Sequence, residues 1–94
     1  MKLVMIIVDG ERKEELEAFL NRAGVLGYTE IPRTLGIGTT GPRLGSRAFP
    51  KTSAIIFTVI AAEALNALVE DIKAYCDGCD ERLKMIVWGV EEVL

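Results

Sequence analysis

The chain has 94 residues, of which 50% are apolar, and this predicts a single domain over 1–94 with a hydrophobic core rather than a disordered segment. Its net charge of −3 argues against a general nucleic-acid-binding protein, because such proteins usually present a basic surface. No apolar run approaches the ~20 residues of a membrane span. No signal-type cleavage site follows a basic segment either, so we expect a cytoplasmic protein without a membrane span.

The first part of the chain predicts a strand followed by a helix. Residues 2–8 form a short, uninterrupted apolar run, which favours a buried strand. Asp9 can cap a helix that follows it, and Gly24 stands where a left-handed C-terminal cap is expected. The apolar face of this helix has the i, i+3, i+4, i+7 spacing and consists of Leu16, Phe19, Leu20 and Ala23.

Three further strands and a second helix are predicted after the first helix. A second strand is expected over 26–35, where Pro32 confines it to a sheet edge or a bulge. An apolar strand over 53–60, an amphipathic helix over about 65–76 and a last strand over 83–90 follow. The order βαββαβ predicts an α+β, ferredoxin-like fold with a four-stranded antiparallel sheet.

A long segment, 36–51, separates the second and third strands and is rich in glycine, proline and arginine. A compact domain rarely keeps so long a loop unless the loop binds something. No acidic residue occurs between Glu30 and Glu63, so this positive segment is suited to an anion or an acidic partner. Its charge comes from four basic residues in the segment or beside it: Arg33, Arg43, Arg47 and Lys51.

The strands are apolar at nearly every position, as in LVMIIV, AIIFTVI and MIVWGV. Two helices cover only one face of a four-stranded antiparallel sheet, so the other face would normally alternate apolar with polar residues. An uncovered apolar face predicts self-association through the sheet. The alternative is a different fold that buries these strands within one chain.

The residues Gly36-Ile37-Gly38-Thr39-Thr40-Gly41 match the letters of a dinucleotide-binding GxGxxG motif. Pro42 follows with no helical pattern, so the helix N-terminus that would bind a pyrophosphate is missing. Glycines at 36 and 38 still allow a backbone to approach a ligand and present amides to an anion. A flexible exit from the strand is the alternative interpretation.

Chemistry-bearing side chains are few, because the sequence has no histidine and therefore no Ser–His or Cys–His pair. Cys76 and Cys79 form a CxxC at the end of a predicted helix among acidic residues, which disfavours a thiolate. They are interpreted as incidental residues of a turn or as a reversible disulfide. Lys84 interrupts an apolar strand, either as an edge-strand lysine or as a cation aimed at a phosphate or carboxylate.

Several short segments together resemble the PII signalling superfamily, of which this chain would be a divergent and shortened member. The resemblance implies a ferredoxin-like homotrimer that senses adenine nucleotides in clefts between subunits and contacts partner proteins through a long T-loop. It implies that Gly36, Ile37, Gly38 and Lys84 contact the nucleotide or another small anion, and it places Arg43 and Arg47 in the partner-binding loop. The segments are MKLVMIIV at 1–8, GVLGYT at 24–29, LGIG at 35–38 and KMIV at 84–87.

The leading hypothesis is therefore a non-enzymatic regulatory homotrimer whose effector changes the loop over 36–51. The alternative is a metal-binding trimer similar to the CutA-type proteins, which would use Cys76, Cys79 and nearby carboxylates because these two thiols cannot complete a metal site alone. A third hypothesis is a small enzyme with a catalytic dithiol.

Overall fold

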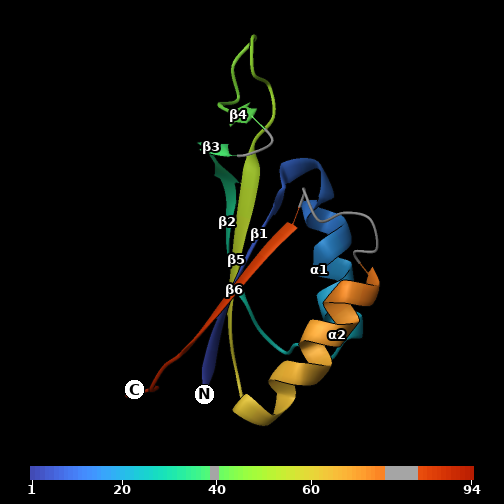
Figure 1. Cartoon of the computed structure of the whole chain (residues 1–94), viewed down its shortest axis with the longest axis vertical. Coiled ribbons are helices and arrows are strands. Elements are labelled where there is room, and N and C mark those ends of the chain that lie inside the picture. The colour runs from blue at the N-terminus through green and yellow to red at the C-terminus, as the bar shows by residue number, and fades with distance from the viewer. Residues whose placement is uncertain (39–40, 76–82) are drawn as a thin grey trace.

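The computed structural model describes residues 1–38, 41–75 and 83–94. Two helices lie on one side of a sheet, a hairpin projects from one end of that sheet, and both termini lie toward the other end (Figure 1). The elements are β1 (Lys2–Asp9), η1 (Gly10–Arg12), α1 (Lys13–Arg22), β2 (Thr29–Thr34), β3 (Gly36–Gly38), β4 (Gly41–Arg43), β5 (Ser53–Ile60), η2 (Ala62–Ala64), α2 (Leu65–Tyr75) and β6 (Leu83–Gly89).

The main sheet has four strands in the order β2-β5-β1-β6, and every neighbouring pair is antiparallel. The two central strands, β1 and β5, are therefore distant in sequence but adjacent in space. The edge strands are β2 and β6. This is the ferredoxin-like α+β fold that the sequence predicts, with β3 and β4 forming a separate two-stranded hairpin.

The core lies between the sheet and the helices, and alternate residues of each central strand point into it. Leu16 and Leu20 of α1 are fully buried there, as their helical spacing predicts. Asp9 caps the first turn through Glu11 N–H, and Gly24 ends the helix region at φ 83°, so both predicted helix signals are confirmed. The remaining buried apolar residues are Val4, Ile6, Val8, Ala54, Ile56, Leu68 and Ile72.

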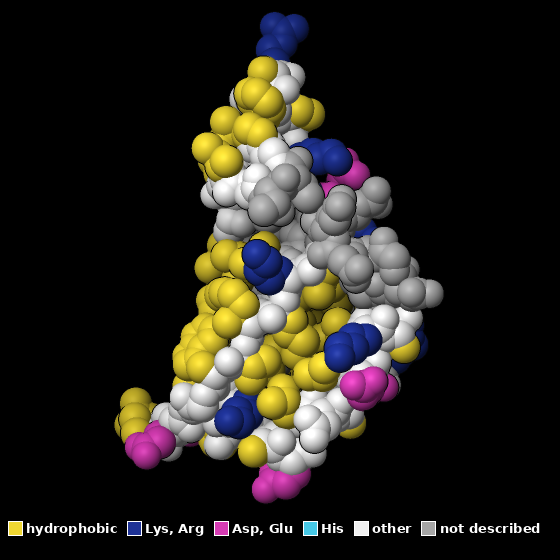
Figure 2. Space-filling view, in the orientation of Figure 1, with side chains coloured by type: hydrophobic (Ala, Val, Ile, Leu, Met, Phe, Trp, Pro, Cys, Tyr) yellow, Lys and Arg dark blue, Asp and Glu magenta, His cyan; other side chains and the backbone are white. Residues whose placement is uncertain are grey.

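The sheet face opposite the helices, here called the open face, is also apolar. Figure 2 shows apolar side chains gathered along the side of the sheet turned away from the helices. On this face, Val59 is 45% exposed, Ile86 is 40% exposed and Trp88 is 42% exposed. The alternative of a fold that buries these strands within one chain is therefore wrong. The strand register places on this face Leu3, Met5, Ile7, Ile31, Ile55, Phe57, Val59, Ile86 and Trp88.

Two details near the loop differ from the simplest sequence expectation. The second strand begins at Thr29 rather than near residue 26, and its pairing with β5 shifts between Ile31 and Thr34, which is the edge irregularity that Pro32 predicts. The segment after it is not a plain loop, because β3 and β4 pair within it.

In the described part of the chain, neither helix is long and apolar enough to cross a membrane.

Candidate functional site

The β3–β4 hairpin exposes the glycine-rich backbone that the sequence singles out. Gly36, Ile37 and Gly38 make up β3, and all three are exposed. Gly36 lies opposite Arg43 and Gly38 opposite Gly41 in the antiparallel pairing. Chain neighbours aside, no atom of residues 1–38, 41–75 and 83–94 lies within 4 Å of the position that a Cβ would take at Gly36 or Gly38, so a ligand can approach this backbone. The exposed edge of β3 can therefore present amides to an anion.

The base of the hairpin is fastened to the end of β1 by a largely buried ion pair. Arg43 Nη1 lies 3.3 Å from Asp9 Oδ2, and the two side chains are 14% and 6% exposed. The other oxygen of Asp9 accepts the backbone N–H of Glu11 at 3.3 Å. Gly10 N–H donates to the carbonyl of Thr52 at 3.0 Å. Both arms of the segment over 36–52 are thus tied to the body of the domain.

The outer part of the segment is a turn with a basic tip. Ser46 N–H donates to the Phe49 carbonyl at 3.0 Å, and Phe49 N–H donates to Ser46 Oγ at 3.1 Å. Arg47 lies within this turn and is exposed, whereas Arg33 donates to the Gly45 carbonyl at 3.4 Å. Figure 2 shows Lys or Arg atoms at the outer end of the segment with apolar side chains beneath them. Arg47 can therefore reach another molecule.

Lys84 is exposed on the edge strand β6, at the same end of the sheet as the hairpin. Its register row runs from Lys84 through Ile7 and Ile55 to Ile31 on β2. Three strand spacings of about 4.8 Å separate the two edges by about 14 Å. One chain therefore brings Lys84 and Gly36–Gly38 to the same end of the sheet but to opposite edges.

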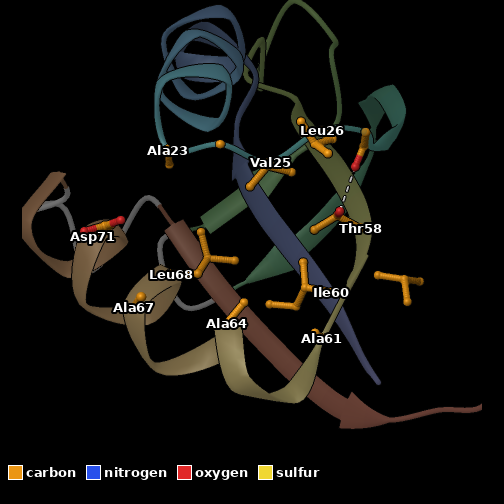
Figure 3. A pocket seen from close by; sticks show the side chains of 13 residues that line it. Ala23, Val25, Leu26, Thr58, Ile60, Ala61, Ala64, Ala67, Leu68 and Asp71 are labelled. Atoms are coloured by element: carbon orange, nitrogen blue, oxygen red, sulfur yellow. Dashed lines mark hydrogen bonds between the residues drawn. The ribbon is translucent and has the colours of Figure 1, made fainter.

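Sequence reasoning missed a pocket of about 290 Å³ at the other end of β5. It lies between the turn after α1, the end of β5 and the start of α2 (Figure 3). Thr58 donates its hydroxyl to the Gly27 carbonyl at 2.7 Å and so holds the turn against β5. The pocket is lined by Ala23, Gly24, Val25, Leu26, Gly27, Thr58, Val59, Ile60, Ala61, Ala64, Ala67, Leu68 and Asp71.

The signal that could have found this pocket is a run of small residues. Ala61, Ala64 and Ala67 recur at a spacing of three, so the wall of the pocket formed by η2, α2 and the residue before them carries three methyl groups beside Leu68 and Asp71. The facing turn contributes Gly24 and Gly27, which have no side chain at all. Small side chains on both walls leave room for an apolar group between them. None of the residues that the sequence predicts for the site lines this pocket.

A charge network positions β2 beneath α1. Lys13 Nζ lies 3.0 Å from Glu17 Oε1 and 3.1 Å from Glu30 Oε1, which joins the helix to the strand. The hydrogen bonds to Glu17 and Glu30 raise the pKa of Lys13 above its usual value. The ammonium group of Lys13 therefore joins α1 to β2 through Glu30.

Residues 1–38, 41–75 and 83–94 contain no group of three or more histidine, cysteine, aspartate or glutamate side chains that could hold a metal ion. Cys76 and Cys79, on which the metal-binding and dithiol hypotheses depend, lie outside the described residues. Both hypotheses therefore stay predictions.

Comparison with known proteins decides the family. The family model described as nitrogen regulatory protein P-II matches residues 1–93. The chain belongs to the nitrogen regulatory protein P-II family. No curated protein matches the sequence.

Solved structures of a P-II-like protein share this fold. CPII from Thiomonas intermedia K12, bound to ADP, AMP and bicarbonate, matches with a TM-score of 0.73 and 26% identity over 93% of this chain and 82% of that chain. The structure of CPII bound to ADP and bicarbonate gives the same values. CPII bound to ADP, AMP and acetate matches with a TM-score of 0.70 and 24% identity over 92% and 81% of the two chains.

Proposed function

We propose that this chain is a regulatory homotrimer that binds an adenine nucleotide between subunits and a partner protein through its hairpin segment. The observation that carries the proposal is the match over 93% of the chain to a P-II-like protein whose structure holds ADP, AMP and bicarbonate. The exposed backbone of Gly36–Gly38 supports it, because such a backbone suits a phosphate. The role is regulatory rather than enzymatic, and the lack of histidine removes the commonest general base.

The two halves of the effector site come from different subunits. Within one chain, Lys84 and Gly36–Gly38 lie at opposite edges of the sheet. A cyclic trimer joins unlike patches at each interface, so the β6 edge of one subunit can face the β2 edge of the next. Lys84 of one subunit then supplies a cation to a phosphate held at β3 of its neighbour.

The hairpin segment is the proposed surface for the partner protein. Arg47 is exposed at its tip, and Arg43 is engaged at its base with Asp9, so the two residues predicted to bind the partner differ in their access. Leu44 and Phe49 beside the tip are 39% and 44% exposed. An apolar contact surrounded by positive charge suits an acidic surface on the partner.

Calorimetric titration with ADP, AMP and ATP tests the nucleotide site. We expect saturable binding near one nucleotide per subunit in the native protein. Lys84→Ala removes a charge-assisted hydrogen bond worth roughly 1.5–3 kcal/mol, so ADP affinity should fall at least tenfold. Gly38→Val should weaken ADP binding as well, because the added Cβ lies in space that no described residue beyond its chain neighbours reaches within 4 Å, which is the space open to a ligand.

Lys73→Ala is the matched control, since Lys73 is 71% exposed on α2 and lies 3.9 Å from Glu70 on the same helix. Its ADP affinity should equal that of the native protein. If no nucleotide gives heat with the native protein, the proposed effector is wrong. If Lys84→Ala binds ADP like the native protein, Lys84 is not part of the site.

A further inference from the structure

The pocket beside Gly27 has small and apolar walls but also one charged side chain. Among the described residues that line it, only Asp71 carries a charge, and it lies on α2. Asp71 follows Ala64 by seven residues and Ala67 by four, so the helical period places all three on one side of α2. The pocket therefore combines an apolar wall with a carboxylate, and no lysine or arginine is among these lining residues.

The helix ends beside the pocket add to this polarity. Ala23, which lines the pocket, is the C-cap of α1, where the aligned peptide dipoles place partial negative charge. Helix α2 begins at Leu65, about 9 Å before Asp71 along the helix axis, so the positive end of its dipole lies away from that carboxylate. In Figure 3, Ala23 and Asp71 lie on one side of the pocket and Ala61 lies on the other. One side of the pocket thus attracts a cation, and the other is apolar.

The turn between α1 and β2 forms the mouth of the pocket. Thr58 is 4% exposed and fixes this turn to β5 through its 2.7 Å hydrogen bond to the Gly27 carbonyl. Val25 of the turn packs against the core, whereas Leu26 is fully exposed. A ligand in the pocket would give the Leu26 side chain an apolar surface to cover. The volume of about 290 Å³ is at the small end of ligand sites, so the ligand is a small molecule.

We propose that this pocket binds a small alkylammonium ion, with its ammonium group at Asp71 and its aliphatic chain between Ala64 and the turn. A primary ammonium supplies both the positive charge and the N–H donors that a carboxylate accepts. A short branched chain buries its methyl groups against the alanine side chains. A carboxylic acid would instead place a second negative charge beside Asp71. This site goes beyond the proposed nucleotide site at Gly36–Gly38 and Lys84 and does not depend on it.

A heteronuclear NMR titration with isoamylamine tests the site, because amide signals that shift report where a weak ligand binds. We expect saturable shifts at the amides of Gly27, Ala64 and Ala67 in the native protein. Isoamyl alcohol has the same chain without the charge, and isovalerate carries the opposite charge. Isoamylamine should bind about fivefold more tightly than the alcohol, as expected for an ion pair at an open site, and isovalerate should bind more weakly than either.

The variant Asp71→Asn removes the charge and keeps the shape of the side chain. Its affinity for isoamylamine should fall about fivefold, to that for isoamyl alcohol, and its affinity for the alcohol should be unchanged. Glu70→Gln is the matched control, since Glu70 lies on the same helix, is 74% exposed and does not line the pocket. Its affinity for isoamylamine should equal that of the native protein.

The variant Ala67→Leu tests the apolar wall. Ala67 is exposed, so a larger side chain occupies the pocket without displacing the core. Binding of both isoamylamine and isoamyl alcohol should be lost. Ala74→Leu is the control, because Ala74 is exposed on the same helix and does not line the pocket. Circular dichroism checks that each variant is folded.

The outcomes separate this site from the nucleotide site. Equal affinities of the native protein for isoamylamine and isoamyl alcohol would overturn the cationic class of ligand. Pocket amides that do not shift, or an unchanged affinity for isoamylamine in folded Asp71→Asn, would overturn the site. Asp71→Asn should keep the ADP affinity of the native protein, and a loss would show that the pocket is part of the nucleotide site. If the native protein binds isoamylamine but not ADP, the amine site stands and the proposed nucleotide site is wrong.

Discussion

At the scale of single residues, the hydroxyl of Thr58 is the main polar contact between the pocket turn and the sheet. It is 4% exposed and donates to the Gly27 carbonyl at 2.7 Å. Thr58→Val keeps the shape but removes the donor, which should lower the free energy of unfolding by about 1 kcal/mol. Urea denaturation measures this loss. Equal midpoints for Thr58→Val and the native protein would contradict the structural role of Thr58.

Tyr75 gives a prediction about pH. Burial, followed by the nearby charge of Glu15, raises the pKa of Tyr75 above its usual value of about 10. The neutral phenol is favoured in the folded state, so its contribution to stability is complete below the unfolded pKa and is lost as pH rises through the folded pKa. Tyr75→Phe should therefore lose less stability than the native protein between about pH 10 and 12. Urea denaturation across this range checks it, and parallel losses would contradict it.

At the scale of elements, the sequence predicts the strands and helices that have a regular apolar spacing. It does not predict the short hairpin, whose strands are defined by their pairing. The strand at 53–60 and the buried pair Leu16 and Leu20 follow from apolar spacing, and both are observed. The hairpin of β3 and β4 has only three residues in each strand, too few for an alternation pattern to identify. It is tied to the body of the domain by tertiary contacts, among them that of Arg43 with Asp9, which lies far away in the sequence.

The candidate site shows the same division. Gly36 and Gly38 could be chosen from the sequence because glycine itself marks close backbone approach, and the structure leaves them exposed. That Arg43 is held by Asp9 while Arg47 is exposed could not be predicted, because both are arginines of one segment. The pocket beside Gly27 lies between small residues of two elements that are separate in the sequence. No single sequence motif could therefore identify it.

At the scale of the whole molecule, charge and hydrophobicity are separated. The hairpin segment is basic, with no acidic residue between Glu30 and Glu63, although the chain as a whole has 14 acidic and 11 basic residues. The open face is apolar and spans four strands, about 19 Å across and about 27 Å along the longest strands, or about 500 Å². That area is near the upper limit of the largest patch on a typical monomer, so assembly through this face is favoured.

The proposed trimer is tested by placing a charge in the middle of the open face. Phe57 lies on the central strand β5, between Met5 on one side and Thr29 on the other. A buried, unpaired carboxylate is strongly disfavoured at an interface, so Phe57→Glu should convert a particle of three times 10.3 kDa into a monomer in analytical ultracentrifugation. Asn66→Glu, on the exposed surface of α2, should stay trimeric. A monomeric native protein would contradict the proposed assembly.

The same variant connects assembly to function. If Lys84 and Gly36–Gly38 act together only across two subunits, a folded Phe57→Glu monomer keeps every one of these residues and still loses ADP binding. Its calorimetric titration should then resemble that of Lys84→Ala rather than that of Asn66→Glu. A monomer that binds ADP as tightly as the native protein would place the whole effector site within one chain and would contradict a site shared between subunits.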